Sequence, residues 1–354
     1  MNNVQKNIIY SVLLLASISA VYLYRAAQRP VLMEIRGEAM GTTYQIKYLD
    51  YKSRQFKSSV DSLLLVFNQS LSTYQKDTEI SAFNQDSAKT ITFKLPFFYP
   101  VLAKSLEIYK ATDGAFDPTV APLVNAWGFG FKTEKFPDSS RVDTLRRLVG
   151  FEKINFDKNQ VTKLKKGVML DFNAIAQGYG VDVVAQFFEK QGIQNYMIEI
   201  GGEVLCKGKN AEDKFWSIGI ANPTYEASGG SPTQAIVQLE NKALATSGNY
   251  RKFYIIDKKK YSHTVNPKTG YPVQHSLLSA TVIAKDCMSA DAYATAFMVM
   301  GLDKAKQFLA QNPSLDAYFV YANADGSLAT YMTKGLEKSL QEVAPKPTQK
   351  ADKP

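Results

Sequence analysis

The fold class follows from residues 171–207, DFNAIAQGYGVDVVAQFFEKQGIQNYMIEIGGEVLCK. After the first ten residues, apolar side chains recur at helical spacing and predict a helix with one buried face; they are Val181, Val184, Phe187 and Phe188. Two strand-like runs, at 196–200 and 203–207, then flank the Gly201-Gly202 pair, which is typical of a β-hairpin. The rest of the chain is also mixed helix and strand, so we expect an α+β fold, organised as a single mixed α/β domain behind an N-terminal anchor or signal segment.

Further elements are expected on both sides of this segment. Strands are expected at 33–36, 42–48, 154–156, 168–170, 216–220, 235–239, 253–256, 280–284, 318–322 and 329–332. Helices are expected at 60–71, 102–109 and 289–300. Ser289 is the expected cap of the last helix and Gly301 its stop, while the polar stretch 132–142 is expected to be an exposed connection.

Composition limits the classes of function. The chain has 354 residues, 45% of them hydrophobic, which is enough for one large domain or two small ones. Its 42 Lys and Arg against 33 Asp and Glu give a net charge of +9, spread along the chain. No recognised nucleic-acid-binding motif is present, so we expect no nucleic acid, whereas a basic surface suits a phosphorylated or acidic ligand. We interpret residues 30–340 as one domain and 341–354 as a disordered Lys- and Pro-rich tail.

Residues 1–29 form an N-terminal anchor or signal segment. An apolar run at 8–24, IIYSVLLLASISAVYLY, follows Lys6 and precedes Arg25 and Arg29. Its length is at the lower edge of what spans a bilayer as a helix, so an uncleaved anchor and a cleaved secretory signal are both open. The small-residue triplet Ser17-Ile18-Ser19 lies inside the run and does not clearly mark a cleavage site. We therefore favour an anchor with the domain on the periplasmic, extracytoplasmic side of the inner membrane.

The two cysteines, Cys206 and Cys287, lie far from the apolar run. No lipobox cysteine follows that run, so a lipid anchor is not expected. Two cysteines cannot make a disulfide framework. A single bridge and two buried thiols both remain open, and we expect the thiols.

Three side chains near the C-terminal third are candidates for chemistry. Asp291 and Thr295 are four residues apart, so they share one helix face and could offer a carboxylate and a hydroxyl oxygen to Mg²⁺. An exposed helical aspartate beside an incidental threonine is the alternative. His263 opens a turn-rich segment and could accept a proton from a hydroxyl nucleophile near neutral pH, or be an ordinary loop histidine.

Polar and aromatic residues elsewhere are candidates for ligand contacts. Tyr74 could stack on an aromatic ring, or be a half-buried loop tyrosine. Asp117 and Asp171 could accept hydrogen bonds from a ligand, or cap turns and helices as aspartates commonly do. No G-x-G-x-x-G, P-loop, C-x-x-C or H-E-x-x-H motif is present, which argues against Rossmann, P-loop and zincin chemistry.

Taken together and in order, these segments resemble the ApbE-like family, the FAD:protein FMN transferases formerly called thiamine biosynthesis lipoproteins. The resemblance runs from about Met40 to Gly301. It is carried by MGTTYQIKY, LSTYQKDTEISAFN, TDGAFDPTVAPLVNAWGFG, DFNAIAQGYG with IEIGGEV, and TSGNYRKFY followed by YSHTVNPKTGYP and SADAYATAF.

The resemblance implies an activity and a set of site residues. Family members cut the pyrophosphate of FAD and join FMN to a threonine or serine hydroxyl of an acceptor flavoprotein, releasing AMP. The implied Mg²⁺ ligands are Asp291, Thr295 and the carbonyl of Ala174, and His263 is the implied activator of the acceptor hydroxyl. The implied cofactor contacts are Met40, Tyr74, Ala115, Phe116, Asp117, Asp171, Gln177, Thr246, Ser247 and Val265, with Gly248 beside them.

Two departures and two alternative functions accompany the resemblance. Gln177 stands where many members have Lys, which would remove one positive contact to the ligand, and Asn266 replaces a frequent Asp that makes the same turn. An FAD pyrophosphatase giving FMN and AMP is one alternative, and a non-enzymatic flavin-binding protein is the other. The resemblance implies FAD and an acceptor flavoprotein as partners, the latter expected to be a subunit of a membrane redox complex.

Overall fold

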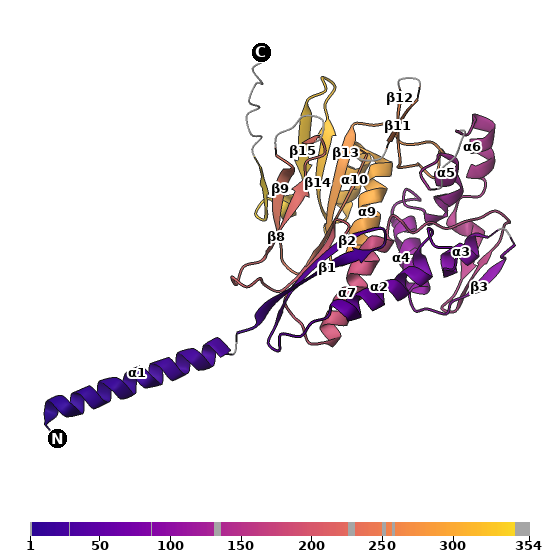
Figure 1. Cartoon of the computed structure of the whole chain (residues 1–354). Coiled ribbons are helices and arrows are strands. Elements are labelled where there is room, and N and C mark those ends of the chain that lie inside the picture. The colour runs from indigo at the N-terminus through magenta and orange to yellow at the C-terminus, as the bar shows by residue number, and fades with distance from the viewer. Residues whose placement is uncertain are drawn as a thin grey trace, which may run out of the picture.

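An eight-stranded antiparallel sheet forms the centre of the molecule (Figure 1). The computed structural model describes residues 2–27, 29–85, 87–130, 136–225, 231–249, 253–256 and 259–343. The strands in order across the sheet are β1 (Val31–Ala39), β2 (Thr42–Asp50), β6 (Tyr196–Ile200), β7 (Glu203–Lys207), β10 (Ala243–Gly248), β13 (Leu277–Ala284), β14 (Asp316–Ala322) and β15 (Leu328–Met332).

One face of this sheet is covered by four helices: α2 (Lys57–Leu71), α7 (Ala176–Lys190), α9 (Cys287–Met300) and α10 (Leu302–Gln311). Alternate residues of β2 enter the core between sheet and helices, because successive side chains of a strand point to opposite faces. The predicted inward face of α7 is confirmed, with Val181, Val184 and Phe188 fully buried in this core and Phe187 packed against it.

The opposite face of the sheet packs against a small three-stranded sheet. This sheet contains β16 (Leu340–Glu342), β9 (Thr233–Leu239) and β8 (Trp216–Ala221) in that order. Trp216 and Cys206 lie in the core between the two sheets, and Figure 1 shows β8 and β9 on the side away from α9. Both cysteines are buried free thiols, as expected.

A second helical layer lies beyond α7 and α9. It comprises α3 (Glu79–Asn84), α4 (Phe98–Ala111), α5 (Ala121–Ala126) and α6 (Ser139–Arg146), with a small sheet of β3 (Thr90–Thr92), β5 (Gln160–Lys163) and β4 (Ile154–Phe156). A hairpin of β11 (Phe253–Ile256) and β12 (Lys259–Ser262) rises beside it (Figure 1). The α+β prediction is confirmed, since helices and antiparallel strands segregate into layers.

The tight turns explain the best-predicted elements. Met40 and Gly41 have φ of 54° and 72°, so the β1–β2 hairpin turns on two left-handed residues, the geometry that matches the twist of paired strands. Gly201 and Gly202 have φ of 69° and 110° and join β6 to β7 at the predicted residues. Both hairpin tips lie near the start of α7, which places them beside the candidate site.

Several local predictions are wrong. The cap of α9 is Asp286, whose carboxylate accepts from the amide of Ser289, so the helix begins two residues before the predicted cap. Residues 168–170 form no strand, because they lead into the loop before α7. Residues 139–146 form α6, which begins inside the predicted connection, while 131–135 lie outside the described residues. The strand β16 includes two residues assigned to the tail, and 344–354 are not among those described.

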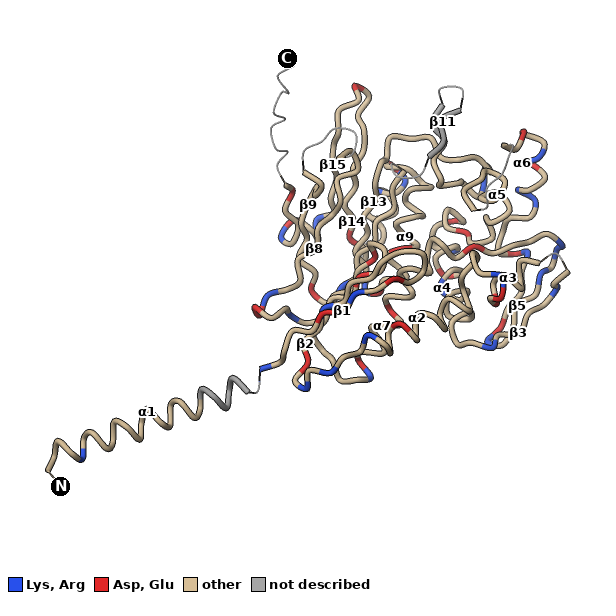
Figure 2. Tube along the Cα trace, in the orientation of Figure 1, with Lys and Arg blue, Asp and Glu red and all other residues tan. Residues whose placement is uncertain are grey.

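The N-terminal helix α1 (Asn3–Ala27) projects away from the body (Figure 1). Within it, Asn3–Val21 has a mean hydropathy of 1.5 and is not buried against the rest of the chain. Its length and composition fit a membrane span or a signal sequence. On the body, Figure 2 shows basic and acidic residues interspersed over both layers, consistent with a positive charge that is not gathered in one arm.

Candidate active site

The candidate site begins where α7 and α9 cross. Asp291 of α9 is 6% exposed, and its Oδ2 accepts a hydrogen bond of 3.0 Å from the amide of Gly178 in the first turn of α7. A Cβ on Gly178 would lie 2.3 Å from the carbonyl oxygen of Cys287, so only glycine permits this close approach. Burial raises the pKa of Asp291 to about 7, although the Gly178 amide opposes that shift.

Thr295 lies one helical turn after Asp291, as the four-residue spacing predicts. Its Oγ1 is 3.0 Å from Oγ of Ser247 on β10. Thr246 points to the other face of the sheet, where its Oγ1 is 2.8 Å from Oγ1 of Thr281. The structure therefore brings Ser247 to the α9 face and does not bring Thr246 there.

The donor set at this crossing fits a hard divalent cation. Asp291 offers a carboxylate and Thr295 a hydroxyl on one face of α9, and Ala174 has a backbone carbonyl in the loop just before α7, four residues before Gly178. No ion pair among the described residues involves Asp291, so its buried charge lacks a cationic partner there. In the described part of the chain, no three His, Cys, Asp or Glu residues cluster as a metal site. One carboxylate with neutral oxygens suits Mg²⁺, which completes its shell with water and phosphate oxygens.

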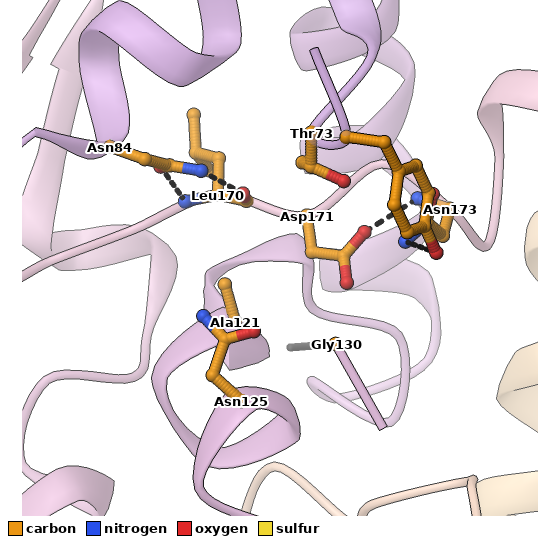
Figure 3. Close-up of a pocket in the computed structure, with 9 residues that line it drawn as sticks. Thr73, Asn84, Ala121, Asn125, Gly130, Leu170, Asp171 and Asn173 are labelled. Atoms are coloured by element: carbon orange, nitrogen blue, oxygen red, sulfur yellow. Dashed lines mark hydrogen bonds between the residues drawn. The ribbon is translucent and has the colours of Figure 1, made fainter. Parts of the chain in front are cut away.

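A pocket of about 290 Å³ lies beside the loop that leads into α7 (Figure 3). Its walls are Thr73, Tyr74, Asn84, Ala121, Asn125, Gly130, Leu170, Asp171 and Asn173. Two predicted contacts, Tyr74 and Asp171, therefore line one cavity. Tyr74 is 65% exposed, so its ring is available for stacking. One oxygen of Asp171 accepts from the Asn173 amide at 2.8 Å, and burial raises the pKa of this carboxyl.

The Ala115-Phe116-Asp117 segment supports this pocket from behind. All three residues are buried. Asp117 caps the short helix η1 (Pro118–Val120) by accepting from the amide and hydroxyl of Thr119, and burial raises its pKa to about 6. The amide of Asp171 donates to the Pro118 carbonyl, which ties the two loops together. Asp117 therefore caps a helix, the alternative given for it above. Its carboxylate does not line the pocket.

Met40 and Gln177 form the rim at the start of α7. The Met40 sulfur lies 3.0 Å from where a Cβ on Gly180 would be, and Gln177 Nε2 lies 2.6 Å from the corresponding position on Gly201. Both glycines therefore let the hairpin tips approach α7 closely. These two residues lie at the α7 crossing and do not line the pocket of Tyr74 and Asp171.

His263 lies in a turn held against the second helical layer. Its ring is 6.4 Å from the ring of Phe129 in an edge-to-face arrangement. The indole of Trp127 donates to the carbonyl of Gly270 at 2.8 Å, which anchors the far side of the turn. Val265 is 5% exposed and packs with Trp127 in the core of α5 and α6, so its side chain does not line the pocket of Tyr74 and Asp171.

The order of these segments along the chain matches one known family. A model of the ApbE family matches residues 40–319. The chain belongs to the ApbE family. It is 38% identical over 325 residues to the FAD:protein FMN transferase of Haemophilus influenzae, covering 88% of this chain and 93% of that protein.

Solved structures of ApbE proteins share the fold. Flavin transferase ApbE from Vibrio cholerae has a TM-score of 0.78 at 34% identity, covering 88% of this chain and 99% of that one. The apo form of the Pseudomonas stutzeri flavinyl transferase ApbE has a TM-score of 0.76 at 31% identity, covering 86% and 96%. These likenesses confirm the sequence-based assignment to the family and its mixed fold.

Sequence reasoning missed several residues of this ApbE site. Thr73, Asn125 and Asn173 line the pocket, but a polar residue in a loop or at a helix end carries no distinctive signal. Asp182 is different, because it is a carboxylate among the apolar residues of α7 and is 8% exposed. An acidic residue on a predicted buried face is itself a signal, since buried charges require partners.

Proposed function

We propose that this chain is an FAD:protein FMN transferase. In the proposed reaction, a threonine or serine hydroxyl of an acceptor protein attacks the FMN phosphorus of FAD. The P–O bond to the AMP half breaks, AMP leaves, and the hydroxyl proton passes to a base. The names of the relatives support this activity, and one observation carries it: a buried carboxylate, Asp291, lies at a helix crossing with the Thr295 hydroxyl one turn away.

We assign the metal-binding role to Asp291, Thr295 and the Ala174 carbonyl. Mg²⁺ bound there would offset negative charge on the diphosphate, which is the main requirement of phosphoryl transfer. Ser247 supports this assignment, because its hydroxyl contacts Thr295 and can fix the orientation of the Thr295 oxygen. Gly178 holds the Asp291 carboxylate in place through its amide.

His263 is the proposed base for the acceptor hydroxyl. An imidazole titrates near neutrality, so it can accept a proton at physiological pH. Its turn is attached to α5 through Trp127, and the chain from Asn125 to Gly130 joins this region to the pocket of Tyr74 and Asp171. That connection supports a site in which the flavin nucleotide lies between the pocket and the histidine.

The remaining predicted contacts are assigned to binding of FAD. Tyr74 and Asp171 line the pocket, while Met40 and Gln177 form the rim near the metal ligands. Ala115, Phe116 and Asp117 support the pocket loop through Pro118. Thr246, Ser247 and Val265 are proposed to border the same space from β10 and the histidine turn.

One experiment separates the transferase from its alternatives. The full chain is incubated with FAD, Mg²⁺ and an acceptor domain that contains a threonine, and products are resolved by gel fluorescence and chromatography. A transferase yields covalently fluorescent acceptor and AMP in equal amounts. Free FMN with AMP would indicate a pyrophosphatase, and unchanged FAD bound to the chain would indicate a flavin-binding protein; either result contradicts the proposal.

We further propose that α1 anchors the enzyme in the inner membrane, with the domain on the periplasmic, extracytoplasmic side. The exposed apolar helix supports this, and the acceptor would then be a subunit of a membrane redox complex. Protease protection of spheroplasts tests the topology. A domain that resists external protease in intact spheroplasts would contradict the periplasmic side. A chain found only in soluble fractions would contradict the anchor.

A further inference from the structure

Three asparagines line the pocket beside α7, and they differ in what their carboxamides do. Both amide atoms of Asn84 bind the backbone of Leu170, each at 2.8 Å. Asn173 directs its Nδ2 toward the hydroxyl of Tyr74 at 3.5 Å. The side chain of Asn125 makes no hydrogen bond to the described residues of the chain. Only Asn125 therefore presents an uncommitted carboxamide to this cavity.

The fold makes room for the Asn125 carboxamide. Its Oδ1 lies 2.0 Å from the position that a Cβ on Gly130 would occupy, so a side chain at 130 would collide with it. Asn125 is half-buried at the end of α5 and lines the pocket, so water can reach its amide and a ligand group can replace that water. An amide without a partner among the described residues is suited to bind a ligand.

The opposite wall supplies a complementary group. Asp171 and Asn125 approach the pocket from different elements, the loop before α7 and the end of α5 (Figure 3). The Asp171 carboxylate can accept a hydrogen bond, whereas the carboxamide both donates and accepts. The exposed ring of Tyr74 adds a stacking surface. These three groups suit a flat heterocycle that displays donors and acceptors along one edge.

The pocket is open to solvent. The space of about 290 Å³ at its mouth includes that solvent, so a single flat ring system held there would leave the rest of a larger ligand outside. FAD carries two such ring systems, the isoalloxazine of its FMN half and the adenine of its AMP half.

We propose that Asn125 is a specificity-determining residue that hydrogen-bonds the edge of one heterocyclic ring of FAD in this pocket. This inference rests on the proposed function, because that function supplies FAD as the ligand. A ring whose edge does not match the Asn125 carboxamide leaves that carboxamide without a hydrogen bond. Such a ring therefore binds with lower affinity.

Binding of FMN and of AMP, each as a separate probe, tests the inference in the full chain. Affinity is measured by calorimetry for the wild type, Asn125→Ala and Asn125→Asp. Asn125→Ala should weaken one of the two probes about tenfold and leave the other within about twofold. Asn125→Asp keeps the shape and removes the amide donor, so it should weaken the same probe. The weakened probe identifies which ring occupies the pocket.

A matched substitution, Asn323→Ala in the β14–β15 turn, removes an asparagine that does not line the pocket and should change neither affinity. Unchanged affinity for both probes in the Asn125 variants would overturn the inference. Equal weakening of both probes with a lowered melting temperature would also overturn it, because that pattern indicates a structural role. If the wild type binds neither probe, the proposed function itself fails, a result distinct from failure at Asn125.

Discussion

Asp182 of α7 and Asp291 of α9 each accept hydrogen bonds from the N-terminal backbone of the helix that carries the other. Asp182 accepts from the amides of Cys287 and Met288, both at 2.8 Å, and Asp291 accepts from the amide of Gly178 at 3.0 Å. Helix N-termini carry unpaired N–H groups and partial positive charge, so both contacts are favourable. These reciprocal hydrogen bonds fix the position of α9 along the axis of α7, and therefore the position of the Asp291 carboxylate.

Asp182→Asn should weaken these reciprocal hydrogen bonds. The amide group keeps the shape of the side chain but turns one acceptor into a donor, which faces a backbone N–H of α9. We expect the free energy of unfolding to fall by about 1–3 kcal/mol. Because the Asp291 ligand then moves, the rise in melting temperature that Mg²⁺ produces should shrink. Thermal unfolding with and without Mg²⁺ measures both effects.

Asp316→Asn is a control for that prediction. Asp316 is also buried and accepts from Lys242 and Thr333, but it lies in β14 at the far side of the sheet. This variant should lose stability while keeping the full response to Mg²⁺. If Asp182→Asn keeps the same Mg²⁺ response as the wild type, Asp182 does not position the metal ligand.

Gly178→Ala should separate α7 from α9. The new Cβ would meet the Cys287 carbonyl at 2.3 Å and the Asp291 Cβ at 2.8 Å, and both lie on α9. Overpacking of this kind typically costs about 1–3 kcal/mol. We expect weaker Mg²⁺ binding by calorimetry and reduced flavin transfer. Gly219→Ala in β8 is the comparison, because its backbone is not left-handed and the nearest atom to its Cβ position, Thr233 Cγ2, is at an ordinary contact distance of 3.5 Å; transfer as weak as that of Gly178→Ala would show that helix crowding is not the cause.

Asp117 should make stability depend on pH. Burial raises its pKa to about 6 in the folded chain, above the ordinary value of about 3.9. The folded state then binds more protons between these values, so Asp117 contributes stability at pH below about 4 that is lost as the pH rises through 6. Relative to Asp117→Asn, the wild type should lose on the order of 1–3 kcal/mol from pH 4 to pH 7. Parallel denaturation curves over that range would contradict this.

The elements that could be predicted from sequence are those specified locally. Gly201-Gly202 and Met40-Gly41 adopt positive φ, so the turns and their flanking strands follow from a few adjacent residues. The strand β10 was missed because its Thr246-Ser247-Gly248 end consists of small polar residues that also suit a loop. Pairing with β7 and β13 and packing against α9 make it a strand, and those contacts are not visible in the local pattern.

The site divides in the same way. Asp291 and Thr295 could be paired from their spacing, because a helix repeats locally. The bond between Asp182 and Cys287 spans 105 residues, and helical periodicity does not encode the relative sliding of two helices. The cap of α9 was misplaced for a related reason: Asp286 and Ser289 are both good capping residues, and contacts of Asp182 with Cys287 decide where the helix begins.

Thr295→Val should remove the hydroxyl while keeping the shape of the side chain. If the hydroxyl binds Mg²⁺, metal affinity should fall by about tenfold or more, whereas Thr295→Ser should retain most of it. Ser247→Ala should have a smaller effect, because Ser247 acts only through its 3.0 Å contact with Thr295 Oγ1. Titration with Mn²⁺ followed by electron paramagnetic resonance measures affinity without turnover. Equal affinity of the Val and Ser variants would remove Thr295 from the ligand set.

Trp127→Phe should slow transfer without weakening the binding of flavin nucleotide. The indole N–H of Trp127 donates to the Gly270 carbonyl and anchors the turn that carries His263, so its loss should leave the imidazole less well positioned. We expect kcat to fall about tenfold, since small misplacements of a catalytic group are costly, while the KM for FAD stays within about twofold.

Trp216→Phe is a matched control, because Trp216 donates its indole N–H to the Lys207 carbonyl at 3.2 Å in the core behind the sheet. Both variants lose an indole hydrogen bond to a backbone carbonyl, but only Trp127→Phe should lower kcat. Equal kcat values for the two variants would show that the turn does not need this anchor and would weaken the assignment of His263 as the base.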